Sequence, residues 1–176
     1  MIMIRLTNPD GTFVSDLATT KTAAGDGFFA VKSISFSTEQ TLNIGSSSSG
    51  AGAGKVTFNP FSFTLPSGPL DATLFTKQAT GDAFKTVEVQ LFPSSAGPTG
   101  SGLPVAYETV NMKLVAVKTI SWSAGDADGI TEFTLEYGSL VVAAPSTAVG
   151  ALPKTVTGGW NRVTNTADQT LVTKLT

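Results

Sequence analysis

Two chemically reactive residue types are missing from this chain of 176 residues, which contains no cysteine and no histidine. Without cysteine the chain has no disulfide and no thiolate metal site, and without histidine it has no imidazole base. A serine nucleophile would then need a lysine as its base, and the predicted helix carries no such pair. Catalysis by carboxylates or lysine is still open to such a chain, but no arrangement of these residues in the sequence supports it. We predict that the chain is not an enzyme and that it binds no cofactor and no metal.

Charged residues are also scarce, at 14% of the chain against the roughly 25% usual for soluble domains. The net charge is −2 and the only arginines are Arg5 and Arg162, so no basic cluster is present. This argues against nucleic acid as a partner. A surface with few ions can, however, pack against copies of itself without desolvating many charges.

Long apolar runs are absent as well. No stretch approaches the roughly 18 apolar residues of a membrane-spanning helix, so we predict no membrane insertion. The N-terminus has only Met1 to Ile4 before Arg5, which is too short an apolar segment for a cleaved signal peptide. If the protein leaves the cell, we expect a route without a cleaved leader.

What the chain does have is alternation of apolar and polar residues with a period of two, which is typical of β-strands. The length fits one domain, residues 1–176, with 167–176 as a tail. Six to eight strands with few helical segments predict an antiparallel barrel or sandwich. The strands are expected at residues 2–6, 28–42, 55–65, 84–91, 107–123 and 130–142, with a last short one from 158; loops are expected at 12–27, 45–54, 93–104 and 143–157.

The alternation changes phase within residues 55–65. Val56 and Phe58 are apolar at even positions, whereas Phe61 and Phe63 are apolar at odd positions. A one-residue slip would turn the second set to the wrong face. We therefore expect a bulge or bend at Pro60, where proline is tolerated.

One helix is predicted, over residues 67–80. Ser67 is a candidate N-cap, and Gly81 suits the end of a helix. The apolar residues lie on one side at helical spacing, so the helix should lie on the outside of a sheet. They are Leu70, Leu74 and Phe75.

Several motifs resemble functional sites, but each has a simpler interpretation. Gly54-Lys55 lacks the earlier glycine and the following serine or threonine of a phosphate loop, and Asp126 to Gly129 fits a hairpin turn better than a calcium loop. Glu132 and Glu136 lie about 13 Å apart on a strand, too far for paired catalysis, so they are interpreted as solvated or subunit-contact residues. Trp122 and Trp160 are predicted to pack in the core or an interface, rather than to stack a sugar or a base.

Three stretches in order around the single helix resemble the Hcp family, the stackable tube component of bacterial type VI secretion systems. The first is Gly50 to Phe58 with Phe61-Ser62-Phe63-Thr64, a glycine-rich loop ending in Gly-Lys-Val before a Ser-Phe-Thr strand. The second is Leu114 to Trp122 followed by Glu132 to Tyr137, which is similar to the family's late hairpin. The third is Gly159-Trp160-Asn161, which is similar to its closing Gly-Trp-Asn.

The resemblance implies a mainly β fold, an antiparallel two-sheet β-barrel with one flanking α-helix. It implies hexameric rings stacked into a hollow tube, assembled in the bacterial cytoplasm and then secreted. The implied partners are other copies, a spike protein, sheath and baseplate components, and small effectors in the lumen. Ring or stacking contacts are expected at Gly45, Ser48, Gly50, Gly52, Gly54, Lys55 and Trp160.

The residues themselves leave a second function open. The two tryptophans and the Thr/Ser-rich surface would also suit a monomeric β-sandwich that serves as a binding or adhesion module. Against this interpretation, no row of aromatic residues at strand spacing is visible. The mass of the protein in solution separates the two hypotheses.

Overall fold

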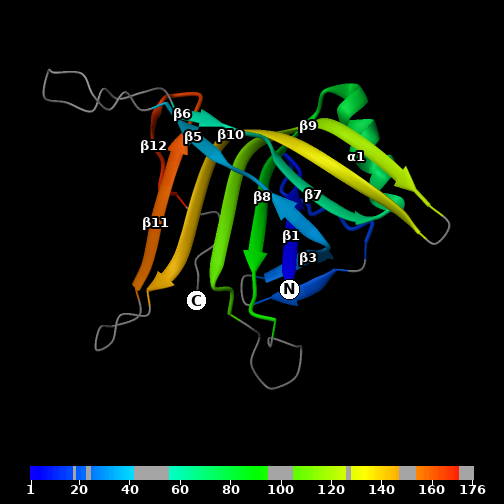
Figure 1. Cartoon of the computed structure of the whole chain (residues 1–176), viewed down its shortest axis with the longest axis horizontal. Helices are drawn as coiled ribbons and strands as arrows, with labels where there is room; N and C mark the ends of the chain where they lie inside the picture. Colours follow the sequence, from blue (N-terminus) through cyan, green and yellow to red (C-terminus); the bar gives the residue numbers. More distant parts are fainter. Residues whose placement is uncertain are drawn as a thin grey trace, which may run out of the picture.

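The computed structural model describes residues 1–17, 19–22, 25–41, 56–94, 105–125, 128–146 and 154–170. This part of the chain is mostly β-strand and contains one helix (Figure 1). No helix in it is both long and apolar enough to cross a membrane. The elements are β1 (Ile2–Thr7), β2 (Thr20–Thr22), β3 (Gly25–Val31), β4 (Ser33–Ser35), β5 (Thr38–Gln40), β6 (Val56–Phe58), β7 (Phe61–Pro66), α1 (Pro69–Thr80), β8 (Ala83–Leu91), β9 (Glu108–Ala124), β10 (Gly129–Ser146), β11 (Lys154–Asn161) and β12 (Thr166–Ala167).

The strands form a barrel whose hydrogen-bonded path returns to its start. β1 pairs with β8, β8 with β9, β9 with β10, β10 with β7, and β7 with β4, all antiparallel. β4 continues β3 after the single residue Lys32, whose N–H donates to the Thr64 carbonyl at 2.8 Å, and β3 pairs with β1. The predicted fold class, a mainly β antiparallel barrel with one flanking helix, is confirmed.

β10 belongs to two parts of the fold. Its first half, Ile130 to Leu135, pairs with β7 and closes the barrel. Its second half, Ser139 to Ser146, pairs instead with β11, which pairs in turn with β12. The sheet therefore extends beyond the barrel, and β11 and β12 lie on the opposite side of the molecule from α1 (Figure 1).

The core lies inside the barrel and is rich in phenylalanine. Phe63 on β7 and Phe133 on β10 are register partners, and their rings stack at 5.1 Å between centroids. Burial of such large apolar side chains contributes about 1.5–3 kcal/mol each. The fully buried phenylalanines of this core are Phe29, Phe61, Phe63, Phe84 and Phe133.

The helix α1 covers the free edge of β9 beyond the end of its pairing with β8. Gln78 donates to the Lys118 carbonyl at 2.8 Å, and Leu70 and Leu74 are fully buried. The expected end at Gly81 is confirmed, because Gly81 has a φ of 75°, in the left-handed region that favours glycine.

Two details of the predicted helix are wrong. Gly68, not Ser67, is the N-cap, because the Ser67 hydroxyl is hydrogen-bonded to the Thr131 hydroxyl at 2.8 Å. Phe75 is 53% exposed and does not join the buried stripe. Instead its ring lies 6.4 Å from that of Trp122, on the outer side of β9.

The expected change of phase at Pro60 is confirmed as a bend. β6 pairs with β5 in a separate two-stranded sheet, whereas β7, which begins directly after Pro60, enters the ten-stranded sheet. The chain changes sheets at residues 59 and 60, so the two sets of apolar side chains belong to different sheets.

Three predicted boundaries are corrected. Residues 28–42 are not one strand, because the chain leaves β3 at Lys32 and then β4 at residues 36–37 to enter a different sheet. The predicted loop 12–27 contains β2 and the start of β3. The described parts of the predicted loop 143–157, which are residues 143–146 and 154–157, are strand. Pro145 is tolerated there because β9 pairing ends at Ala143, which leaves one side of β10 without a partner strand.

Candidate self-association surface

The outer edge of β11 is the clearest unpaired strand edge in the described part of the chain. On one side, all of β11 pairs with β10, from Asn161 to Lys154. On the other side, the pairing among described residues is that of β12 with Trp160 and Asn161. An exposed run of unpaired N–H and C=O groups is a template for a strand of another chain. Val156, in the middle of this edge, is 59% exposed.

The unpaired edge of β11 ends at Gly159, because the segment after β12 packs against Gly159. The Asp168 N–H donates to the Gly159 carbonyl at 3.1 Å, and a Cβ on Gly159 would overlap the Asp168 carbonyl oxygen. Asp168 is also ion-paired with Lys113 at 3.3 Å. The backbone N–H of Thr170 and the Lys113 ammonium outweigh burial and lower the pKa of Asp168.

Trp160 is the only predicted contact residue that the structure describes. It lies on β11 opposite Leu140 and is 37% exposed, and Trp122 is 55% exposed. The prediction that they pack in the core is therefore wrong; contact with another copy stays a prediction. Their partners on β10, Thr131 and Leu140, are separated by about 30 Å of strand, so the two indoles do not form one ligand platform.

The remaining predicted contacts lie outside the described residues: Gly45, Ser48, Gly50, Gly52, Gly54 and Lys55. They belong to the segment that connects β5 to β6. We call β5 and β6, residues 38–40 and 56–58, the arm. Every residue of the arm is exposed except Phe58, which is partly buried against the core.

The arm is attached to the barrel at its base. The Tyr137 hydroxyl donates to the Asn59 carbonyl at 3.0 Å, and the Asn59 N–H donates to the Ser37 carbonyl at 3.0 Å. Burial raises the pKa of Tyr137 above its ordinary value of 10.0, which moves the loss of this donor further into the alkaline range. The Arg162 guanidinium lies 5.9 Å from the Phe58 ring centroid and 5.2 Å from that of Tyr137.

A cluster of charged side chains, Glu136 with Lys118 and Arg162, lies beside the attachment of the arm. Glu136 accepts from Lys118 at 2.8 Å and from Arg162 at 3.1 Å. Burial alone would raise the pKa of Glu136, but these two hydrogen bonds outweigh it and hold the pKa below the usual value. Glu132 is exposed, so the two glutamates lie on a solvated face, as expected for them.

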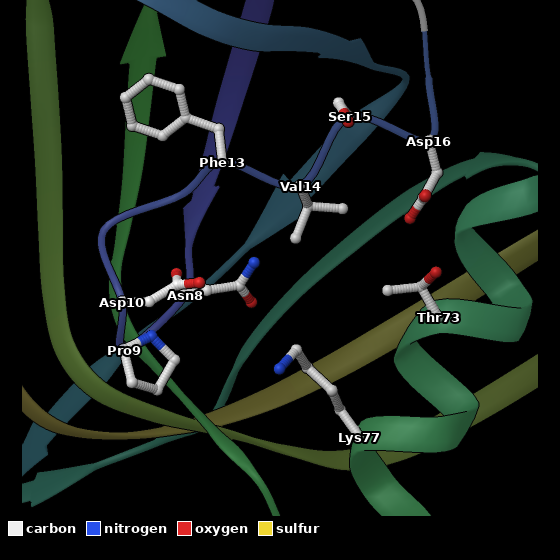
Figure 2. A pocket seen from close by; sticks show the side chains of 9 residues that line it. All are labelled: Asn8, Pro9, Asp10, Phe13, Val14, Ser15, Asp16, Thr73 and Lys77. Atoms are coloured by element: carbon white, nitrogen blue, oxygen red, sulfur yellow. The ribbon is translucent and has the colours of Figure 1, made fainter.

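A shallow groove of about 470 Å³ lies between residues 8–16 and α1 (Figure 2). Val14 and Phe13 are among its apolar lining residues, and Val14 and Lys77 point into it from opposite sides. The Lys77 ammonium lies 5.0 Å from the Phe84 ring centroid. Asp10 and Lys77 give the groove both signs of charge, and hydrogen bonds from the Thr12 hydroxyl and N–H lower the pKa of Asp10.

The described ranges contain no candidate metal centre. No group of three or more His, Cys, Asp or Glu side chains in them could hold a metal ion. The predicted hairpin turn at Asp126 falls partly outside the described residues, but the pairing of Gly129 with Ala124 confirms the hairpin itself. Gly129 is a strand residue and its φ is not positive.

The fold and surface define a class of protein: a small antiparallel barrel with one flanking helix, an open strand edge and a projecting arm. A family model described as "Type VI secretion system effector, Hcp" matches residues 19–143. The chain therefore belongs to the Hcp family of type VI secretion proteins. No curated protein matches the sequence at a significant level.

Solved structures have the same fold at low sequence identity. Hcp1 from Salmonella typhimurium is 16% identical with a TM-score of 0.64, over 95% of this chain and 99% of that one. A type six secretion system protein is 13% identical with a TM-score of 0.71, over 95% of this chain and 98% of that one. A chain from the anti-feeding prophage baseplate is 13% identical with a TM-score of 0.53, over 80% and 91%.

Proposed function

We propose that this chain is the tube subunit of a type VI secretion system. Six copies close into a ring, and the rings stack into a hollow tube. Membership of the Hcp family supports this proposal, as does the wide coverage of both chains in the structural comparisons. The whole chain, residues 1–176, acts as one domain in this assembly.

The observation that carries the proposal is the open edge of β11. A cyclic ring uses a heterologous contact, in which one patch of a subunit meets a different patch of the next. Lys154 to Gly158 offer an edge with one charge and no proline. Proteins that remain monomeric protect such edges with charges, prolines or bulges. The edge therefore suits a neighbouring copy, with Trp160 beside it.

Stacking is assigned to the arm. It projects from the barrel with both strands exposed, and the glycine- and serine-rich segment that joins them would allow close backbone approach to the next ring. Each contact would be small, but the copies in a ring act together and multiply the affinity.

The further partners follow from the tube. They are a spike protein at its tip, sheath and baseplate components around it, and small effectors in the lumen. The anti-feeding prophage baseplate contains a chain of this fold, which supports the baseplate contact. The tube assembles in the bacterial cytoplasm and leaves the cell with the secretion event.

The test is the mass and shape of the purified protein. At about 10–50 μM we expect native mass spectrometry to give a hexamer and negative-stain images to show annular particles. The double variant Val156→Lys, Gly158→Lys places two charges on the β11 edge, where Val156 is exposed and a Cβ on Gly158 meets nothing within 4 Å. It should remain folded and be monomeric.

The matched control is Phe75→Lys on α1, which also adds charge at an exposed apolar position but away from the edge. It should form rings like the unmodified protein. A wild-type protein that stays monomeric over this concentration range would contradict the proposal. Retention of a glycan by such a monomer, lost on Trp160→Ala, would support the binding-module function instead.

A further inference from the structure

Arg162 lies where the arm, β10 and the end of β11 meet. Its N–H donates to the Gly138 carbonyl at 2.8 Å, which pins its backbone to β10. The next turn is fixed as well, because the Asn161 side-chain oxygen accepts from the N–H groups of Val163 and Thr164 at 2.9 and 3.1 Å. Arg162 therefore starts from a rigid position.

The Arg162 side chain reaches two elements at once. Its Nη1 donates to the Tyr137 carbonyl at 2.8 Å and to Glu136 Oε2 at 3.1 Å, both on β10. Its guanidinium faces the rings of Tyr137 and Phe58. Phe58 is the last residue of β6, so one planar cation links the arm to the barrel.

The arm needs such a link because its own sheet is minimal. β5 and β6 pair through three residues each, Thr38 to Phe58, Glu39 to Thr57 and Gln40 to Val56. A two-stranded sheet on its own is marginally stable at best. The described contacts that hold it to the barrel are all at the Phe58 end, so these contacts decide the direction in which the arm projects.

We infer that Arg162 is a positioning residue for self-association, which fixes the direction of the arm so that the arm can dock onto a second copy stacked on the first. This inference rests on the proposed function. An arm held in one direction loses less conformational entropy on docking than a swinging one. We expect that lysine cannot replace Arg162, because an ammonium lacks the planar face that a guanidinium presents to two rings.

Arm direction can be measured directly, because a chain without cysteine takes spin labels only where they are introduced. Thr57→Cys on the arm and Thr119→Cys on β9 place labels at two exposed positions, and dilution with unlabelled protein isolates the distance within one chain. We expect a narrow distribution in the parent protein and a clearly broader one with Arg162→Ala or Arg162→Lys. The matched control is Lys118→Ala, which removes the other partner of Glu136 but no contact to the arm; it should remain narrow.

Assembly gives the second measurement. With Arg162→Ala, the concentration needed for stacked filaments should rise about tenfold while the mass of the single ring stays unchanged. Lys118→Ala should stack like the parent. If Arg162→Ala stacks like the parent and gives the same distance distribution, the inference is overturned. It is also overturned if Arg162→Ala is monomeric, because Arg162 would then be needed for the ring itself.

The two proposals can fail separately. If the parent protein forms neither rings nor filaments, the proposed function is wrong and the stacking role falls with it, while the spin-label distances still decide whether Arg162 positions the arm. If the parent stacks and Arg162→Ala stacks equally well, only the inference about Arg162 is wrong.

Discussion

The two arginines of this chain stand in matching surroundings but differ in burial. Each guanidinium is bound by a glutamate and faces two aromatic rings: Arg5 with Glu88, Phe13 and Phe28, and Arg162 with Glu136, Tyr137 and Phe58. The Arg5 and Glu88 side chains are 8% and 1% exposed, whereas those of Arg162 and Glu136 are 32% and 36% exposed.

This difference separates a residue that holds the fold from one that orients a part of it. The buried pair, at 2.6 Å, lies on the face of β1 and β8 that points away from the barrel core, where Gln90 also donates to Glu88 at 3.0 Å. Removing one partner there leaves a buried charge without its counter-ion. At the exposed pair, water replaces a lost partner, so the same substitution changes geometry more than stability.

The largest expected effect is that of Arg5→Met. The free energy of unfolding at pH 7 should fall by about 3–5 kcal/mol, because the buried Glu88 carboxylate loses its cationic partner. Urea denaturation at fixed protein concentration measures it. The double variant Arg5→Met, Glu88→Leu should recover most of the loss, and a loss no larger than that of Arg162→Met would break the comparison.

The next largest effect on stability is expected for Gly159→Ala. Gly159 is tightly packed in β11, close in sequence to the Arg162–Glu136 pair. A Cβ there would overlap the Asp168 carbonyl and approach the Leu140 carbonyl at 2.8 Å. Overpacking of this kind costs about 1–3 kcal/mol, measured by the same denaturation. Gly158→Ala is the matched control, since its Cβ meets open space. Equal losses of stability for the two variants would contradict the close packing of the Asp168 backbone against Gly159.

Arg162→Met should cost less than about 1 kcal/mol, as exposed ion pairs usually do. The arm should nevertheless lose its fixed direction. Thermal unfolding and the spin-label distances, measured on the same preparation, test both halves. A stability loss comparable to that of Arg5→Met would show that Arg162 holds the fold and would remove the distinction between the two sites.

The smallest effect is the dependence of the exposed pair on pH. Because the folded-state pKa of Glu136 is below its ordinary value of 4.5, its ionised form contributes stability above about pH 4.5, and this contribution is lost as the pH falls through the folded pKa. The stability difference between the parent and Glu136→Gln should therefore be constant near neutral pH and shrink below about pH 4.5. A difference that grows on acidification would contradict the assigned partners.

Local pattern was sufficient for most single elements. The alternation in β8 and β10, the helix end at Gly81 and the bend at Pro60 each depend on neighbouring residues, so they were predictable. The division of residues 28–42 among three strands was not, because only the partners on β1, β7 and β6 determine where each strand ends. Ser67 was mistaken for the N-cap because Thr131, its hydrogen-bond partner, is far away in the sequence.

The self-association surface was also only partly predictable from the sequence. Trp160 was predicted as a contact residue from a short motif, whereas the open edge beside it depends on the end of β12 pairing at Trp160. Tyr137 stood at the end of the hairpin motif Glu132 to Tyr137, but Arg162 belonged to no motif. The role of Arg162 follows only from its contact with Phe58, more than a hundred residues away along the chain.

The sequence by itself determined a β-rich chain with one helix, few charges and no histidine or cysteine, because periodicity and composition are local quantities. Only the tertiary structure decided which arginine is buried, where the sheet ends and how the arm is attached. These properties depend on residues distant in sequence meeting in space, and two arginines of the same chemistry become different residues through what surrounds them.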